Sequence, residues 1–333
     1  MREEPQPSEL RYIQAVNAAL HWALETYPES LAFGEDIALP GGPFGATKGL
    51  HDKFGGRVFD TPISEAAIIG AALGAAMRGR RPIVEIMYGD FLAVAMDQIL
   101  NQVANTRYVS RGRWTAPLTI RTQQGYSPGS CAQHSHSLEA WYAHCPGLRI
   151  GLPANPRDAY EMLRTAIASE DPVMIFEHRL LYPISGPVAL DGPVEAMGGA
   201  RIVRTGSDVT LVTWSRMVSE SLEAAELAAA RGQKVEVVDL RWLSPLDFSV
   251  VAASLHKTGH LVIVHEANVT GGFGAEIAAR AVRDCFWDLD APVLRVGAPD
   301  VPIPASPQLQ TEVIPDRGTI LEAITTVLDE RRW

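Results

Sequence analysis

The amino-acid sequence predicts an α/β protein with two doubly wound α/β domains. Strand-like apolar segments alternate with helix-like segments from the N-terminus to about Tyr182, which predicts a mostly parallel sheet with helices on both faces. Residues 183–199 interrupt the alternation with three prolines and four glycines, and a second alternation follows. We therefore expect one domain over residues 1–185, a linker over 186–199 and a second domain over 200–333.

The elements of the first half follow from local periodicity. Ser8 is expected to cap a helix, because apolar residues recur every three or four positions up to Tyr27-Pro28. The helix expected from Ser64 onward is rich in alanine and glycine, so it must pack closely against its own sheet or another subunit. The other expected elements are strands at 57–62 and 82–87 and a helix at 97–103.

The second half repeats this organisation over a shorter length. Runs of β-branched and aliphatic residues predict strands, and longer amphipathic segments between them predict helices. The expected strands lie at 208–214, 234–240, 260–265 and 292–296, and the expected helices at 219–230 and 318–330.

Charge and composition exclude several classes of function. The chain has 29 basic and 39 acidic residues, a formal charge of −10, which argues against binding nucleic acid or anionic membranes. The longest apolar run, Ile68 to Met77, is too short to span a bilayer, and the acidic, proline-containing start does not resemble a signal peptide. Three cysteines form no disulfide framework. We expect a soluble, cytoplasmic protein.

Glu65 is the first candidate for chemistry. It falls in the first turn of the alanine-rich helix, where the helix dipole favours a carboxylate for purely structural reasons. The alternative interpretation is functional. A carboxylate buried in a surface of small residues has a raised pKa and can share a proton.

The segment Cys131-Ala132-Gln133-His134-Ser135-His136, followed by His144-Cys145, contains every ligand type that zinc prefers. Its spacing fits no common zinc pattern. Polar residues in a loop near a cleft are the structural alternative, and a histidine that donates or accepts a proton is the functional one. The turn Gly271-Gly272-Phe273-Gly274-Ala275-Glu276 follows a strand and opens a helix, as an anion-binding turn does, but it lacks a complete phosphate motif. Close packing explains it better.

These segments together resemble one family. The resemblance rests on Asp60-Thr61-Pro62-Ile63-Ser64-Glu65, Arg81-Pro82-Ile83-Val84-Glu85, Phe91 with Asp97-Gln98-Ile99, Gln133-His134-Ser135, Pro146-Gly147-Leu148, Lys257-Thr258-Gly259-His260, Gly271 to Glu276 and Asp300-Val301-Pro302-Ile303-Pro304, in that order. Over roughly residues 9–330 the chain is similar to the β subunit of thiamine-diphosphate-dependent 2-oxo acid dehydrogenases of the pyruvate, branched-chain and acetoin types.

The resemblance implies a transketolase-like pyrimidine-binding domain followed by a transketolase C-terminal domain. It also implies an α2β2 assembly in which a separate α subunit holds magnesium and the diphosphate. Gly89-Asp90 is consistent with that division, because Phe91 follows it and Asn101 and Asn105 lie at the wrong spacing for the cofactor's metal motif. The alanine-rich helix would then pack in a subunit interface.

The resemblance also assigns roles to individual residues. Glu65 matches the glutamate that hydrogen-bonds the aminopyrimidine ring and promotes loss of the thiazolium proton. Phe91 matches the aromatic residue that packs on the pyrimidine, and Ile63 is its apolar neighbour. His134 matches the histidine that moves protons as the acyl group leaves for a lipoyl thiol. The bound cofactor is the electron sink.

A structural potassium ion is a further implication of the resemblance. The matching positions, which contribute mostly backbone oxygens, are Leu118, Ala166, Ile167, Ser169 and Asp171, and Ser169 and Asp171 differ from the usual side chains. His136 and Arg111 are two further departures. Near the mouth of the site they would favour an anionic donor such as a sugar phosphate, or they are unrelated surface changes.

The leading hypothesis is therefore the β subunit of an enzyme that decarboxylates a 2-oxo acid and transfers the acyl group to a lipoyl-bearing acyltransferase or another acyl carrier. A split transketolase that uses a ketose phosphate is the nearest enzymatic alternative. A non-catalytic scaffold for the α subunit is the alternative from another class.

Overall fold

The computed structural model describes residues 7–329 of the chain. These residues divide into two compact units, one of residues 7–124 and 141–197 and the other of residues 125–140 and 198–329. The first domain was expected to end at residue 185, and the observed units differ from that division in two ways. The segment 125–140 belongs to the second unit, and strand β8 (Ser185–Val188) extends into the region expected to be a linker.

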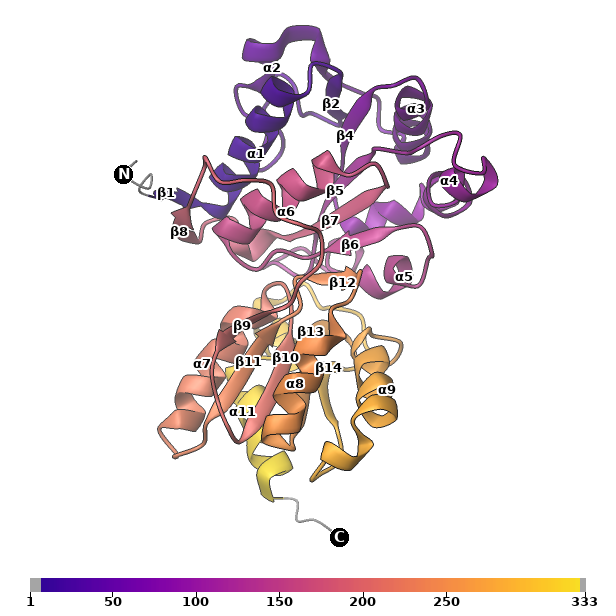
Figure 1. Cartoon of the computed structure of the whole chain (residues 1–333). Helices are drawn as coiled ribbons and strands as arrows, with labels where there is room; N and C mark the ends of the chain where they lie inside the picture. The colour runs from indigo at the N-terminus through magenta and orange to yellow at the C-terminus, as the bar shows by residue number, and fades with distance from the viewer. Residues whose placement is uncertain (1–6, 330–333) are drawn as a thin grey trace, which may run out of the picture. The chain divides into compact units, whose positions relative to one another are not determined.

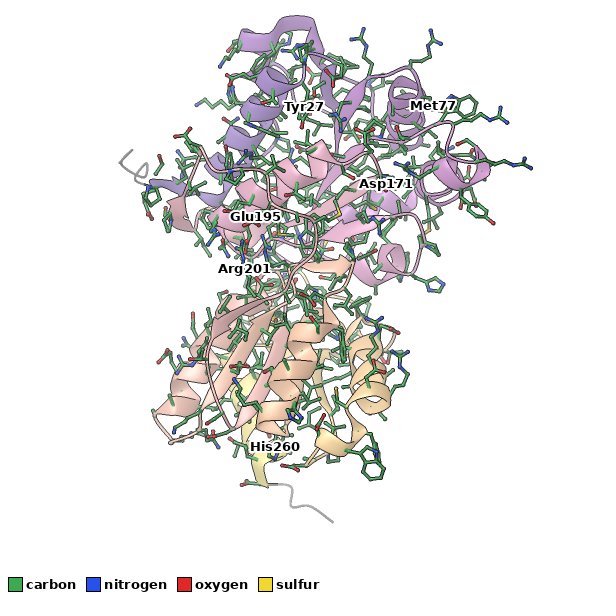
Figure 2. The ribbon with its side chains drawn as sticks, in the orientation of Figure 1. Tyr27, Met77, Asp171, Glu195, Arg201 and His260 are labelled. Atoms are coloured by element: carbon green, nitrogen blue, oxygen red, sulfur yellow. The ribbon has the colours of Figure 1, made fainter. Side chains whose placement is uncertain are left out.

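The first unit contains six parallel strands in the order β6-β7-β5-β4-β2-β3 (Figure 1). Its strands are β1 (Ser8–Arg11), β2 (Ser30–Gly34), β3 (Val58–Asp60), β4 (Arg81–Ile86), β5 (Thr119–Gln124), β6 (Arg149–Gly151), β7 (Val173–His178) and β8. Its longer helices are α1 (Tyr12–Thr26), α3 (Glu65–Met77) and α6 (Pro156–Ala168). Met77, where α3 ends, is labelled in Figure 2.

Short helical segments connect these elements. They are α2 (Leu50–Phe54), α4 (Thr106–Val109), α5 (Glu139–Ala143), the 3-10 turns η1 (Gly55–Arg57), η2 (Gly89–Ala93), η4 (Ala132–His134) and η5 (Arg179–Leu181), and the π-helix η3 (Gln98–Val103).

The second unit contains a five-stranded sheet in the order β14-β13-β10-β11-β9, in which only β9 is antiparallel to its neighbour. The strands of this unit are β9 (Arg201–Arg204), β10 (Val209–Thr213), β11 (Val235–Asp239), β12 (Trp242–Ser244), β13 (Leu261–Asn268) and β14 (Leu294–Ala298). Its helices are α7 (Met217–Ala229), α8 (Phe248–Thr258), α9 (Gly274–Asp284), α10 (Pro307–Val313) and α11 (Arg317–Asp329), with the 3-10 turn η6 (Phe286–Asp288).

The prediction of a doubly wound α/β chain is confirmed, and most predicted elements lie within a few residues of their expected bounds. The predicted helix cap at Ser8 is wrong. Ser8 opens strand β1, which pairs antiparallel with β8, and helix α1 begins only at Tyr12. The helix predicted at 97–103 is present as the π-helix η3.

No helix among residues 7–329 is long and apolar enough to cross a membrane.

Candidate functional site

Glu65 is the first residue of α3, and the loop before it is tied to the end of the sheet. Asp60, the last residue of β3, accepts a hydrogen bond from the Ala38 amide through Oδ1 at 2.7 Å. The Thr61 amide donates to the Gly34 carbonyl, the last of β2, at 2.9 Å. Both strands are parallel, so these contacts fix the start of α3 at the carboxyl edge of the sheet, where ligands bind in open α/β folds.

The Glu65 side chain is 7% exposed. Its carboxylate makes no hydrogen bond or ion pair with the residues that the structure describes. The side chain is therefore mostly buried, while its carboxylate remains open to a bound group that can hydrogen-bond to it. Glu65 begins the helix and is buried, as expected from the sequence, and its role in proton transfer stays a prediction.

Glu35 is a carboxyl group near Glu65 that the sequence analysis did not single out. It follows β2 directly, and burial raises its pKa, with further contributions from the carboxylates of Glu65, Asp36 and Glu85. The signal in the sequence is an acidic pair placed immediately after an apolar strand. Acidic groups thus gather at the carboxyl ends of β2 and β4 and at the start of α3.

The predicted cofactor contacts Phe91 and Ile63 lie in the same unit as Glu65. Phe91 is part of η2, is half-buried, and meets the Tyr88 ring edge-on with centroids 6.1 Å apart. Ile63 precedes Glu65 in the loop, and its side chain is 81% exposed. An exposed isoleucine two positions before a carboxylate that contacts no described protein group suits a flat ring that has one apolar face and one hydrogen-bonding edge.

The turn that carries Phe91 is held by a buried polar cluster from three neighbouring strands. The Gln123 amide donates to Glu85 Oε1 at 2.9 Å, and its Oε1 accepts from the Tyr88 amide at 3.3 Å. Arg121 donates to Glu85 Oε2 at 2.6 Å and, through two nitrogens, to both oxygens of Glu177 at 2.7 and 2.9 Å. No motif in the sequence distinguishes Arg121 or Gln123 from other polar residues in strands.

His134 belongs to the second unit, whereas Glu65, Ile63 and Phe91 belong to the first. It closes η4, whose preceding residue, Cys131, has a φ of 50°. Ser135 fixes this turn, because its hydroxyl donates to the Cys131 carbonyl at 2.6 Å and lies 2.6 Å from the Ser130 hydroxyl. His136 is exposed, and its carbonyl accepts from the Gly125 amide.

The positions matched to a potassium site come together in the first unit, but a guanidinium already contacts two of them. Arg81 Nη1 donates to the carbonyls of Ile167 at 2.7 Å and Ser169 at 2.8 Å. The Leu118 carbonyl accepts from Val173, and that of Ala166 accepts from Ser169. Asp171 is paired with Arg107. This donor set does not fit a potassium ion, and we assign no role to one.

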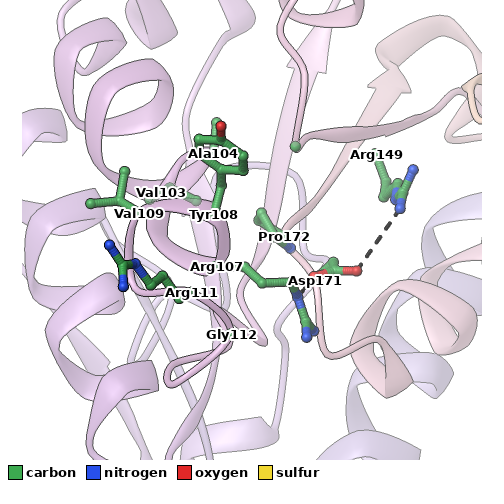
Figure 3. Close-up of a pocket in the computed structure, with 11 residues that line it drawn as sticks. Val103, Ala104, Arg107, Tyr108, Val109, Arg111, Gly112, Arg149, Asp171 and Pro172 are labelled. Carbon is green, nitrogen blue, oxygen red and sulfur yellow. Dashed lines mark hydrogen bonds and ion pairs between the residues drawn. The ribbon is translucent and has the colours of Figure 1, made fainter.

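Arg111 lies in a different place from the predicted cofactor contacts. It lines a pocket of about 740 Å³ together with Arg107, Tyr108, Arg149 and Asp171 (Figure 3). Neither Glu65, Ile63 nor Phe91 lines this pocket. Arg111 is thus grouped with the residues around Asp171.

The glycine turn before α9 is explained by packing, as predicted. It closes over His265 of β13, whose side chain is fully buried and stacks on Trp214 with centroids 5.4 Å apart. A Cβ atom on Gly272 or Gly274 would lie 2.6 or 2.7 Å from the imidazole ring. Among residues 7–329, no group of three or more histidine, cysteine or acidic side chains is arranged to hold a metal ion.

His265 predicts an acid-sensitive fold. Its Nδ1 lies 3.0 Å from the Ala267 carbonyl, and burial lowers its pKa to about 4. The unfolded chain binds this proton near pH 6.5, so native stability falls as the pH drops from about 6.5 to about 4, with a loss of about 2 kcal/mol by about pH 5. Urea unfolding at about pH 6.5 and at about pH 5 measures this loss of stability. The loss should be smaller in His265→Leu, and it should persist in His256→Leu, because His256 is exposed. An equal loss in wild type and His265→Leu would contradict the assignment.

Comparisons with known proteins agree with the two-unit α/β fold. Residues 8–185 match the family described as "Transketolase, pyrimidine binding domain", and residues 198–320 match "Transketolase, C-terminal domain". The chain also has the fold of a solved "Split gene transketolase, inactive beta4 tetramer", with a TM-score of 0.79 and 23% identity over 97% of this chain and 99% of that one.

Several curated relatives are similar over nearly their whole length. A "Pyruvate dehydrogenase E1 component subunit beta" of Leifsonia xyli is 43% identical over 96% of this chain and 95% of its own length. A "3-methyl-2-oxobutanoate dehydrogenase subunit beta" of Mycobacterium tuberculosis is 41% identical over 96% and 92%. An "Acetoin:2,6-dichlorophenolindophenol oxidoreductase subunit beta" of Cupriavidus necator is 40% identical over 93% and 94%. The chain therefore belongs to the thiamine-diphosphate-dependent, transketolase-like family of 2-oxo acid dehydrogenase E1 β subunits.

Proposed function

We propose that this chain is the β subunit of a heteromeric enzyme that decarboxylates a 2-oxo acid and passes the acyl group to a lipoyl-bearing carrier. The observation that carries the proposal is the mostly buried Glu65 side chain at the start of α3, whose carboxylate contacts no described protein group, with exposed Ile63 in the loop before it. Thiamine diphosphate, when bound, supplies the electron sink for decarboxylation.

The residues of this chain would hold the pyrimidine and control its protonation. The Glu65 carboxylate is poised to exchange a proton with a ring nitrogen, because no protein group competes for it among the described residues. Phe91 and Ile63 would offer apolar surface to a flat ring. The diphosphate and magnesium are left to the α subunit, since this chain presents no phosphate-binding motif beside Glu65.

His134 would move a proton at the later step, when the acyl group leaves for the acceptor thiol. Its η4 turn is held by hydrogen bonds among Ser130, Cys131 and Ser135 rather than by regular structure. An imidazole side chain can both accept and donate a proton, which suits a histidine to this step.

A test of His134 separates the two halves of the reaction. In a reconstituted α/β enzyme, His134→Ala should reduce acyl transfer to a lipoyl domain by about 10²-fold or more. Decarboxylation measured with an artificial electron acceptor should fall much less, because that assay bypasses the thiol. His136→Ala, two residues away, is the matched control and should leave both rates near wild type. Equal losses in both assays for His134→Ala would count against this role.

The α partner is proposed to cover the small-residue face of α3. Ala67, Gly70, Ala71 and Gly74 are all exposed along this helix. The same helix contributes to a second pocket, of about 340 Å³, which is lined by Leu73, Met77, Val109 and Trp114 among others. Exposed apolar side chains beside a face on which another backbone can approach closely are typical of a subunit interface.

Gly74→Leu tests this face without disturbing the chain's own packing. A Cβ atom on Gly74 meets nothing within 4 Å, and leucine is a better helix former than glycine. We expect the isolated chain to keep or gain thermal stability and its affinity for the α subunit to fall by about tenfold or more. Gly56→Leu, at another exposed glycine with open space around it, is the control. Unchanged assembly by analytical ultracentrifugation for Gly74→Leu would place the interface elsewhere.

The proposed function itself is tested by calorimetric titration of thiamine diphosphate and magnesium into this chain alone and into its mixture with the α subunit. We expect binding in the mixture only, because Glu65, Ile63 and Phe91 provide the pyrimidine contacts and the partner provides the rest. Tight binding to the isolated chain would overturn the two-subunit site. Absence of binding in the assembled mixture would overturn the proposed function.

A further inference from the structure

Gln123 joins the interior of the first unit to the turn that carries Phe91. Its side chain is buried, with 1% exposed, at the carboxyl end of β5. Through its amide it donates to Glu85 Oε1 at 2.9 Å, and through Oε1 it accepts from the Tyr88 backbone amide at 3.3 Å. One side chain thus bridges the end of β4 and the residue just before η2.

The anchor behind Gln123 is a network of buried, hydrogen-bonded charged groups. Glu85 is itself held by Arg121 at 2.6 Å, and Arg121 is held by both oxygens of Glu177, so that β4, β5 and β7 each contribute one buried charged group. The Tyr182 hydroxyl also donates to Glu177, at 2.7 Å. Because every hydrogen bond in this series from Glu177 to Gln123 is buried, the position of the Gln123 amide is closely determined.

The Tyr88–Phe91 turn, which Gln123 contacts through its Oε1, needs support from outside its own backbone. Tyr88 has a φ of 67°, a conformation that is uncommon for a residue with a side chain and costs of order 1 kcal/mol or more. The Tyr88 carbonyl accepts from the Phe91 amide at 3.1 Å, and the two rings touch edge-on. A shift at the Tyr88 amide therefore moves Phe91.

We propose that Gln123 is a positioning residue, which holds the Tyr88–Phe91 turn so that the Phe91 ring is preformed for the pyrimidine of the cofactor. This inference rests on the proposed function, because it assumes that Phe91 contacts the pyrimidine. Only a side chain with both a donor and an acceptor can make the two bonds. Glutamine meets that requirement without adding a charge beside Glu85.

The test uses the reconstituted α/β enzyme and measures thiamine diphosphate dependence. Gln123→Leu should raise the cofactor KM about tenfold while kcat at saturating cofactor stays within about twofold, since the chemical groups remain and only preorganisation is lost. Thr122→Val is the matched control. It removes a buried hydrogen bond from the neighbouring residue to the Ile86 carbonyl, which does not reach the turn, and should leave the cofactor KM unchanged.

Gln123→Glu supplies a second variant in case the leucine variant folds poorly. Glutamate keeps the acceptor for Tyr88 but loses the donor, and it places a second carboxylate against Glu85. When protonated it can make both bonds again, so its cofactor KM relative to wild type should fall as the pH is lowered from about 8 to about 6. A cofactor KM that stays at the wild-type value in both variants would overturn the inference.

Phe91→Ala distinguishes failure of this inference from failure of its premise. If Phe91→Ala raises the cofactor KM and the Gln123 variants do not, Gln123 does not position the turn. If Phe91→Ala itself leaves the cofactor KM unchanged, the assigned contact between Phe91 and the pyrimidine is wrong.

Discussion

Replacing Glu65 with glutamine should reduce the activity of the reconstituted enzyme by at least about 10²-fold, the usual effect of removing a positioned proton-transfer group. The amide keeps the size and much of the hydrogen-bonding capacity of the side chain, but it cannot take up and return a proton at a ring nitrogen. Because Glu65 is 7% exposed and begins α3, the substitution removes charge from a buried position and should not destabilise the chain.

The measurement is the steady-state rate with saturating cofactor, together with the cofactor affinity from calorimetry. Glu322→Gln, at an exposed position on α11, is the matched control and should retain full activity. A Glu65→Gln enzyme that assembles and turns over at the wild-type rate would remove Glu65 from the chemistry. That result would support a scaffold role for this subunit.

Local patterns in the sequence predict most of the architecture, since strand and helix periods depend on neighbouring residues. Local patterns fail where a segment's structure depends on pairing with a strand that is far away in the sequence. Ser8 to Arg11 looks like the start of a helix, yet it forms a strand because β8, far along the chain, is available to pair with it. The π-helix η3 is likewise not visible in the sequence. It is followed closely by Ala104, whose carbonyl leaves no room for a Cβ atom on Gly147.

In the candidate site, too, some features follow from the local sequence and others depend on distant contacts. The position of Glu65 at a helix start and its burial among small residues follow from its own segment. Arg121 and Gln123 were missed because a charged or polar residue in a strand looks like one that faces solvent. Their partners Glu85 and Glu177 lie 36 to 56 positions away and meet them only when the parallel sheet forms. Networks that support a site are therefore harder to predict than a candidate catalytic group such as Glu65.

Replacing Arg121 with methionine should destabilise the first unit by about 3–5 kcal/mol, the usual cost of breaking a buried ion cluster by removing one partner. Arg121 is 1% exposed and makes three hydrogen bonds to Glu85 and Glu177. Burial alone would lower the pKa of its guanidinium, but the carboxylates of Glu177 and Glu85 raise it above its ordinary value. Methionine fills similar space, so the loss arises chiefly from two carboxylates left without a cation.

The dependence of this loss on pH distinguishes stranded charge from a packing defect. Burial already raises the pKa of Glu177, and removing Arg121 removes the interaction that most opposes that rise. The native variant then binds protons more tightly than its unfolded chain, so its stability increases as the pH falls through the raised pKa. The difference in unfolding midpoint between wild type and Arg121→Met should therefore narrow from about pH 8 to about pH 5.

Two comparisons make the result specific to this cluster. Arg317→Met removes an exposed ion pair with Glu223 and should leave the unfolding midpoint unchanged. In a Glu177→Gln background, Arg121→Met should cost less than it does in the wild type, because one of the two stranded carboxylates is already gone. If the two substitutions were simply additive and the loss did not depend on pH, the cluster would act by packing alone. In that case Gln123 would have no electrostatically fixed anchor from which to hold the Phe91 turn.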